Sequence, residues 1–200
     1  MARPRSISKE DTLERALLLF WKRGYERTSI ADLSEAIGVG PSSIYNTFGS
    51  KEGLFREAIG RYVATYADPA LQLVGNDAGE GVVEFVRGLM RELVKLYTTK
   101  GQPPGCAIFQ AGGAGTPGES SACATTNEVK GSLQRSLRKR FDAYSKAGDN
   151  LSATPRTLSL FVVSSLRGIS QLACDGAGRA DLMKIADHAA RSCVSDSADR

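Results

Sequence analysis

The fold of this chain follows from TSIADLSEAIGVGPSSIYNTFGSK, residues 28–51. Ser29 and Asp32 have capping-box spacing at the start of a helical pattern, and Gly38 stands where a helix is expected to end. Pro41 then opens a second short helix, because the first turn of a helix needs no N–H donor. This second helix is rich in small polar residues and buries little. Two short helices joined by so tight a turn predict a helix-turn-helix, whose second helix enters the DNA major groove.

This region resembles the DNA-binding domain of TetR-type (tetracycline-repressor-like) transcriptional regulators. The resemblance is dense from Ser8 to Ile59 and rests on Gly24-Tyr25, Thr28–Leu33, Val39, Ile44-Tyr45, Phe48 and Ser50–Phe55. It implies an all-α, homodimeric, ligand-responsive regulator, in the first instance a repressor, that binds a palindromic operator in double-stranded DNA. The remaining residues match this family in layout only.

Helical periodicity along the chain predicts an all-α fold of about nine helices. We expect a helix-turn-helix DNA-binding domain over residues 1–60 and an effector-binding and dimerisation domain over residues 61–200. A rod-like helix from residue 51 to about residue 66 would connect them, and Asp68-Pro69 predicts its end. The other predicted helices cover residues 9–23, 81–98, 106–110, 121–147, 154–174 and 179–194.

The amino-acid composition excludes few functions, but it favours some classes of protein over others. The net charge of +4 and pI near 8.9 are compatible with nucleic-acid binding without establishing it. We expect no membrane partner, because no apolar run appears long enough to span a bilayer, and a cytoplasmic location with reduced cysteines. The single histidine, His188, and the absence of a catalytic constellation predict no enzyme, no metal site and no cofactor.

The second helix of the motif carries the candidate DNA contacts. Short hydrogen-bonding side chains let a helix approach base edges, and the amide of Asn46 can pair bidentately with adenine. The resemblance implies base contacts from Pro41, Ser42 and Asn46, and a phosphate contact from Tyr45. It implies further backbone contacts from Thr28, Ser43, Thr47 and Lys51. Each of these residues alone could simply cap a helix or face water, but their combination within this motif favours DNA binding.

No arginine or lysine lies within residues 41–48. Guanine contacts from this helix are therefore not expected, and binding should depend on phosphates and on the spacing of two half-sites.

An unknown small-molecule effector would bind in the second domain, in an apolar cavity with a few polar groups. The candidate lining residues are Phe85, Leu89, Leu93, Cys106, Phe109, Phe141, Leu166 and Ser170. Taken alone, each of them is better explained as an ordinary core residue.

Two apolar helices close to the C-terminus form a predicted helical hairpin. They carry more apolar surface than one core needs, which indicates packing against a second subunit. The candidate interface residues are Leu158, Phe161, Val162, Leu166, Ile169, Leu182, Ile185 and Ala189.

A second hypothesis concerns Cys106, which follows Pro103-Pro104-Gly105 and is expected in the first turn of a helix, where a thiolate is favoured. Cys123 could then resolve a sulfenic acid into a disulfide, giving an oxidant- or electrophile-sensing regulator. The other interpretation of Cys106 is a small buried apolar residue. A DNA-binding protein without effector response, and an activator in place of a repressor, are the remaining alternatives.

Overall fold

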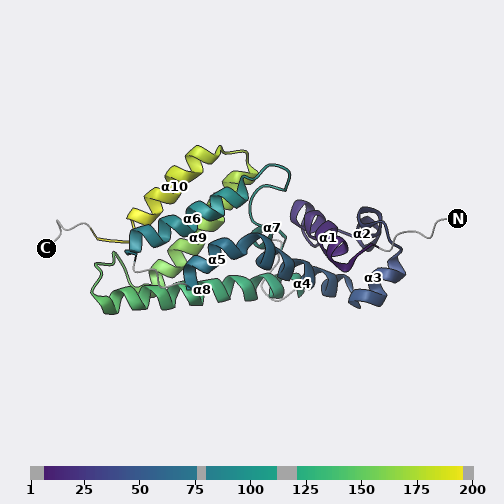
Figure 1. Ribbon diagram of the computed structural model, residues 1–200, viewed down its shortest axis with the longest axis horizontal. Helices are drawn as coiled ribbons and strands as arrows, with labels where there is room; N and C mark the ends of the chain where they lie inside the picture. The colour runs from purple at the N-terminus through teal and green to yellow at the C-terminus, as the bar shows by residue number, and fades with distance from the viewer. Residues whose placement is uncertain (1–6, 76–79, 112–120, 196–200) are drawn as a thin grey trace. The chain divides into compact units, whose positions relative to one another are not determined.

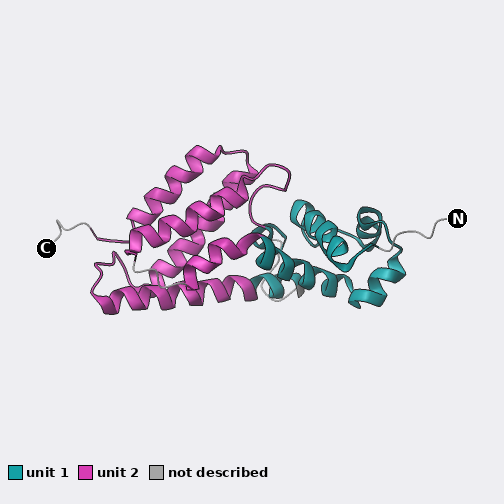
Figure 2. Cartoon of the chain, viewed as in Figure 1, with its two compact units in different colours: residues 1–65, 107–127 teal, residues 66–106, 128–200 magenta. Residues whose placement is uncertain are grey.

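The computed structural model describes residues 7–75, 80–111 and 121–195 (Figure 1). Regular structure in these ranges is helical, apart from one isolated antiparallel bridge between Leu151 and Val194. The chain forms two compact units, residues 1–65 with 107–127 and residues 66–106 with 128–200 (Figure 2). Residues 107–127, which the sequence analysis assigned to the second domain, therefore group with the N-terminal unit.

The first unit is built on α1. Its helices are α1 (Lys9–Arg23), α2 (Ile30–Ile37), α3 (Pro41–Phe48), α4 (Lys51–Tyr62), α7 (Ala107–Ala111) and the first turns of α8 (Ser121–Ala147). α1 packs against α2, α4 and α7. Aromatic rings fill the α1–α4 contact: Phe20 and Trp21 each meet a ring of α4, Phe55 and Tyr62, edge to face at 5.0 Å. Such pairs stabilise the contact beyond the apolar area that they bury.

Hydroxyl side chains begin these helices. The Oγ atoms of Ser8 and Ser50 accept the N–H groups of Asp11 and Gly53, each at 3.0 Å, at the starts of α1 and α4. At α2, Ser29 and Asp32 form the predicted capping box. These caps satisfy N–H groups that have no partner inside the helix, and so they set where each helix begins.

The connecting helix differs from the prediction. α4 ends at Tyr62, a π-helical segment η1 (Val63–Ala67) follows, and α5 (Asp68–Gly75) continues from it. The expectation that Asp68-Pro69 ends the helical structure was wrong. Pro69 is the second residue of α5, and proline is tolerated in the first turn of an α-helix.

The second unit is built on α6 (Val82–Tyr97). It also contains α5, the rest of α8, α9 (Pro155–Cys174) and α10 (Arg179–Arg191). α6 packs against α5, α9 and α10, and Arg91 of α6 holds the Asp187 carboxylate of α10 through two hydrogen bonds of 2.8 and 2.6 Å. α10 ends at Arg191 and not near Val194, because Val194 pairs with Leu151 in the isolated bridge.

α9 also bears on the prediction that no apolar segment of the chain is long enough to span a bilayer. Within the described ranges it is the one helix that is long and apolar enough, by length and composition, to cross a membrane. The prediction that no run reaches this length was wrong. A core helix of a soluble protein passes the same test, and α9 packs against α6 and α10 with Val162 and Leu166 fully buried.

Candidate nucleic-acid interface

α3 is anchored on one side and exposed on the other. Ile44 and Phe48, one turn apart, are 1% and 9% exposed and hold the helix against α2 and α4. The other six of its eight residues are exposed, namely Pro41, Ser42, Ser43, Tyr45, Asn46 and Thr47. A helix held by two side chains presents nearly all of its polar surface, which is the requirement for reading a groove.

The turn before α3 is held by hydrogen bonds from α1 and α2. Gly38 has a φ of 83°, and its N–H donates to the Ser34 carbonyl at 2.8 Å. Glycine adopts this left-handed conformation without the steric cost that a side chain would add. Arg15 of α1 donates from Nη1 to the Ile37 carbonyl at 3.0 Å. The sequence analysis missed Arg15, because nothing in an exposed arginine of α1 indicates a carbonyl 22 residues later.

The start of α2 carries a charged cluster. The Asp32 carboxylate accepts the backbone N–H of Ser29 at 2.8 Å and Nη1 of Arg23 at 2.9 Å. The side-chain hydrogen bond from Ser29, then the backbone bond and the Arg23 guanidinium, lower the pKa of Asp32. Asp32 is thus held as a carboxylate, the form that caps α2.

Thr28 does not lie where the family resemblance implied. Its side chain is fully buried, and its hydroxyl donates to the Gly24 carbonyl at 2.7 Å. That hydroxyl is committed within the protein and does not face a phosphate, because the chain leading into α2 folds back on the end of α1.

Lys51, the first residue of α4, is partly buried. Its Nζ lies 4.0 Å from the centroid of the Tyr25 ring, a cation–π distance. Burial lowers the pKa of Lys51, and the charges of Glu26 and Asp32 oppose this effect. The ring orients the ammonium beside the N-terminus of α4, where backbone N–H groups favour anions.

A short anchored helix that presents small polar side chains after a tight turn defines the class of helix-turn-helix DNA-binding regulators. The comparisons with known proteins agree with this class. The family model described as bacterial regulatory proteins, tetR family, matches residues 13–58. The HTH-type transcriptional repressor ComR of Escherichia coli K12 is 29% identical over 187 residues, which cover 92% of this chain and 88% of ComR.

Two further relatives extend the comparison. The HTH-type transcriptional repressor BdcR of Escherichia coli K12 is 33% identical over 110 residues, 54% of each chain. A cysteine mutant of the TetR family transcriptional regulator CifR, solved in complex with 26-bp double-strand operator DNA, is 31% identical with a TM-score of 0.84. That alignment covers 96% of this chain and 100% of the CifR chain. The chain belongs to the tetR family of bacterial regulatory proteins.

The predicted effector residues are core residues of two different units. Phe85, Leu89, Leu93, Cys106, Phe141, Leu166 and Ser170 are buried in the second unit, whereas Phe109 lies on α7 in the first. Two pairs among them are in contact: the rings of Phe85 and Phe141 lie 6.3 Å apart, and the Cys106 N–H donates to Ser170 Oγ at 2.8 Å.

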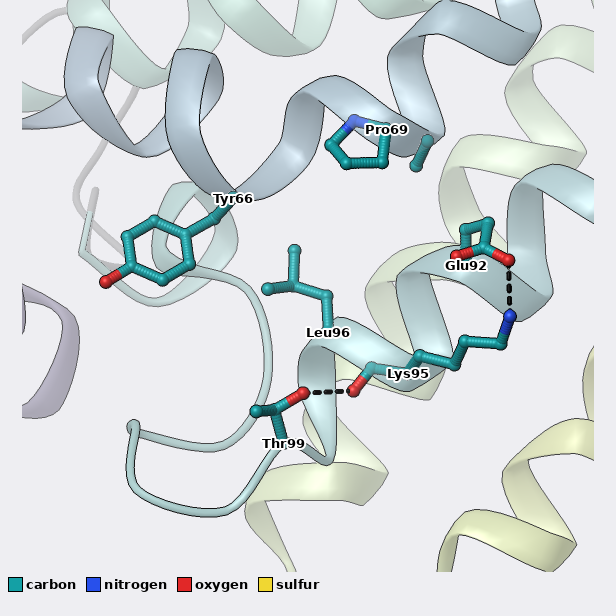
Figure 3. A pocket seen from close by; sticks show the side chains of 7 residues that line it. Tyr66, Pro69, Glu92, Lys95, Leu96 and Thr99 are labelled. Atoms are coloured by element: carbon teal, nitrogen blue, oxygen red, sulfur yellow. Dashed lines mark hydrogen bonds and ion pairs between the residues drawn. The ribbon is translucent and has the colours of Figure 1, made fainter.

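An open groove of about 180 Å³ lies elsewhere in the second unit (Figure 3). It runs along one side of α6 and is lined by Tyr66, Pro69, Ala70, Glu92, Lys95, Leu96 and Thr99. None of the predicted effector residues lines it. The Lys95 ammonium is paired with Glu92 at its rim.

The predicted dimer residues divide into two groups. Leu158, Val162, Leu166, Ile169, Leu182 and Ala189 are buried in the protomer itself and are not available to a second subunit. The apolar periodicity of α9 and α10 thus serves contacts within their own unit. Phe161 and Ile185 are 37% and 40% exposed, and Leu160 and Leu172, which were not among the predicted interface residues, are 44% and 39% exposed.

The cysteine prediction needs one correction. Cys106 precedes α7 and does not lie in its first turn, and α7 is only five residues long, so the helix contributes little to a thiolate there. Cys106 and Cys123 are buried, belong to different units and carry no disulfide. Their pairing stays a prediction.

Proposed function

We propose that this protein is a ligand-responsive repressor that binds a palindromic operator as a homodimer and is released from DNA by a small-molecule effector. The observation that carries the DNA-binding part is α3, which buries two side chains and exposes its polar remainder. CifR aligns with this chain over almost its whole length, and a CifR mutant was solved in complex with operator DNA, which supports the same role.

Within α3 the side chains have different tasks. Asn46 reads a base edge, since an amide can both donate to and accept from adenine. Pro41 and Ser42 lie against neighbouring base edges. Ser43, Tyr45 and Thr47 of α3, together with Lys51 at the start of α4, bind phosphates and so fix the register of the helix without choosing a sequence.

The homodimer forms through the exposed apolar residues of α9 and α10. Leu160, Phe161 and Leu172 of α9 and Ile185 of α10 are large apolar side chains that these two helices leave in solvent. Covering them with the same residues of a second copy would give a symmetric interface, in which one patch meets itself. Two subunits would then present two copies of α3 to two half-sites.

The effector acts by differential binding. A ligand that opens the Phe85–Phe141 region, or that binds the groove along α6, releases DNA only if it binds the DNA-incompetent conformation better. A second candidate function, sensing of oxidants or electrophiles, is favoured by the hydrogen bonds of Cys106 described below. The protein would act in the cytoplasm, and it would act without catalysis.

In the first step of the test, the protein is mixed with a library of random double-stranded DNA, and the duplexes that it binds are recovered. We expect a selected duplex with two related half-sites, bound by two protomers with an affinity that falls as salt rises, with a slope of about −0.9 per phosphate contact. Fluorescence anisotropy measures the affinity, and sedimentation measures the stoichiometry. A library from which no sequence is enriched would contradict the proposal.

A further inference from the structure

Two cysteines of the second unit lie on opposite sides of one backbone contact. The Sγ atom of Cys174, near the end of α9, donates to the Pro104 carbonyl at 3.3 Å. Two residues after Pro104, the Cys106 N–H donates to Oγ of Ser170 at 2.8 Å. Ser170 and Cys174 are four residues apart and share one face of α9. The two hydrogen bonds therefore hold residues 104–106 along the last turn of α9, with Cys174 bonded to one end of this segment and Cys106 at its other end.

The two sulfur atoms differ in their surroundings. Cys174 is partly exposed, whereas Cys106 is 5% exposed. Burial, followed by the charge of Cys106 and a hydrogen bond with its side chain, raises the pKa of Tyr97 well above its ordinary value. The phenol therefore keeps its proton at neutral pH.

We propose that Cys106 and Cys174 are an oxidation site, at which a hydroperoxide produces a reversible disulfide within one chain. This thiol pair, Cys106 and Cys174, replaces Cys123 as the expected partner of Cys106. A disulfide requires the two Cα atoms to lie within about 7 Å of each other, and the two hydrogen bonds fix both cysteines in one contact.

The chemistry balances with the hydroperoxide as the oxidant. The more accessible sulfur, Cys174, attacks the peroxide, takes one oxygen to become a sulfenic acid, and releases water or an alcohol. The Cys106 thiolate then attacks the Cys174 sulfur, the S–O bond breaks, and the departing hydroxide takes a proton to become water. A thiol reductant reverses the reaction and restores both thiols.

The disulfide would reach the DNA-binding unit through the chain itself. Ala107, the residue after Cys106, begins α7, which packs against α1. The other end of α7 is also fixed, because the Tyr25 N–H donates to the Ala111 carbonyl at 3.0 Å. A disulfide at Cys106 would therefore displace the start of α7, a short helix of the unit that carries α3. This effect on DNA rests on the function proposed above, whereas formation of the disulfide does not.

The test uses the wild-type protein, treated with hydrogen peroxide and then digested with trypsin and chymotrypsin under non-reducing conditions. Cleavage after Lys100, Phe109, Arg167 and Arg179 isolates Cys106 in residues 101–109 and Cys174 in residues 168–179. We expect mass spectrometry to find these two peptides linked, and the link to disappear with dithiothreitol or with Cys174→Ser. Linkage of Cys106 to Cys123, linkage between two chains on a non-reducing gel, or no linkage would overturn the proposal.

Anisotropy on a selected duplex tests the coupling separately. We expect oxidation to change the Kd by about tenfold, reversibly, and to leave the Kd of Cys174→Ser unchanged. A mapped disulfide with an unchanged Kd would overturn the path through α7 and leave the oxidation site standing. Failure to select any duplex would count against the proposed function and not against the disulfide.

Discussion

α3 and α9 are both helices with one buried side, but only α9 exposes large aliphatic side chains. The exposed side of α3 is made of short polar residues with one tyrosine, whereas α9 leaves Leu160, Phe161 and Leu172 in solvent. The buried side shows only that a helix belongs to its own core. In the function proposed above, the exposed side decides what the helix meets: a hydrated duplex for α3 and an apolar protein surface for α9.

The largest expected effect comes from placing a charge on the exposed side of α9. Phe161→Glu would bury an unpaired carboxylate in the proposed dimer interface, at a cost of about 3–5 kcal/mol. We expect sedimentation to show monomers and anisotropy to show loss of operator binding. Ser145→Glu, which adds the same charge at an exposed position of α8, is the matched control and should stay dimeric. A dimeric Phe161→Glu protein would show that α9 meets no second subunit at this position.

The second largest effect is expected on the buried side of α3, and it is a loss of stability of the first unit. Ile44→Ala removes a side chain that is 1% exposed and should lower the free energy of unfolding of the first unit by about 2–5 kcal/mol. Thr47→Ala on the exposed side should change it by less than about 0.5 kcal/mol. Trp21, the single tryptophan of the chain, lies in the core of this unit and reports its unfolding in denaturant. Equal effects of the two substitutions would mean that α3 is not anchored as described.

Asn46→Ala on the exposed side should weaken binding to the selected duplex by about 1–3 kcal/mol. Preference at one base pair should disappear with it, because the amide that distinguishes the base is gone. Anisotropy with single-base variants of the duplex measures both quantities. Ser43→Ala is the control, since loss of a phosphate contact weakens all duplexes alike. Unchanged preference in Asn46→Ala would remove the base-reading role.

The smallest effect concerns Lys51 at the start of α4. Lys51→Gln should reduce the slope of log affinity against log salt by about 0.9, the contribution of one phosphate, and leave base preference unchanged. Lys184→Gln, on the exposed surface of α10, should leave the slope unchanged. A slope that stays the same in Lys51→Gln would mean that the cation–π contact with Tyr25 holds this ammonium away from DNA.

The sequence predicts α3 well because its signals are local. Pro41 at the first helical position, Gly38 in the preceding turn and the Ser29–Asp32 capping box each act within four residues, and the structure has all three. Signals that depend on the rest of the fold were missed or wrong. Periodicity marks Leu158 and Val162 as apolar, but only the packed unit shows that its own core buries them.

The same limit applies to the connecting helix and to the candidate sites. No local pattern predicts the π-helical segment before Asp68 or the helix through Pro69, and this helix, α5, packs against α6, which lies outside the local sequence pattern. The sequence suggests a surface hydroxyl at Thr28, whereas in the structure this hydroxyl donates to the Gly24 carbonyl. The hydrogen bonds of Cys106 and Cys174 join residues 104–106 to the end of α9, 64 and 70 positions away in sequence, whereas spacing alone pointed to Cys123.

The most direct test of the central claim removes the exposed side of α3 and keeps its anchor. A variant with Ser42, Ser43, Tyr45, Asn46 and Thr47 all changed to alanine retains Ile44 and Phe48, and alanine favours the helix. We predict wild-type unfolding by Trp21 fluorescence and an intact dimer, with no preference for the selected duplex over random DNA in anisotropy. A folded variant that still prefers the selected duplex with wild-type affinity would contradict the account.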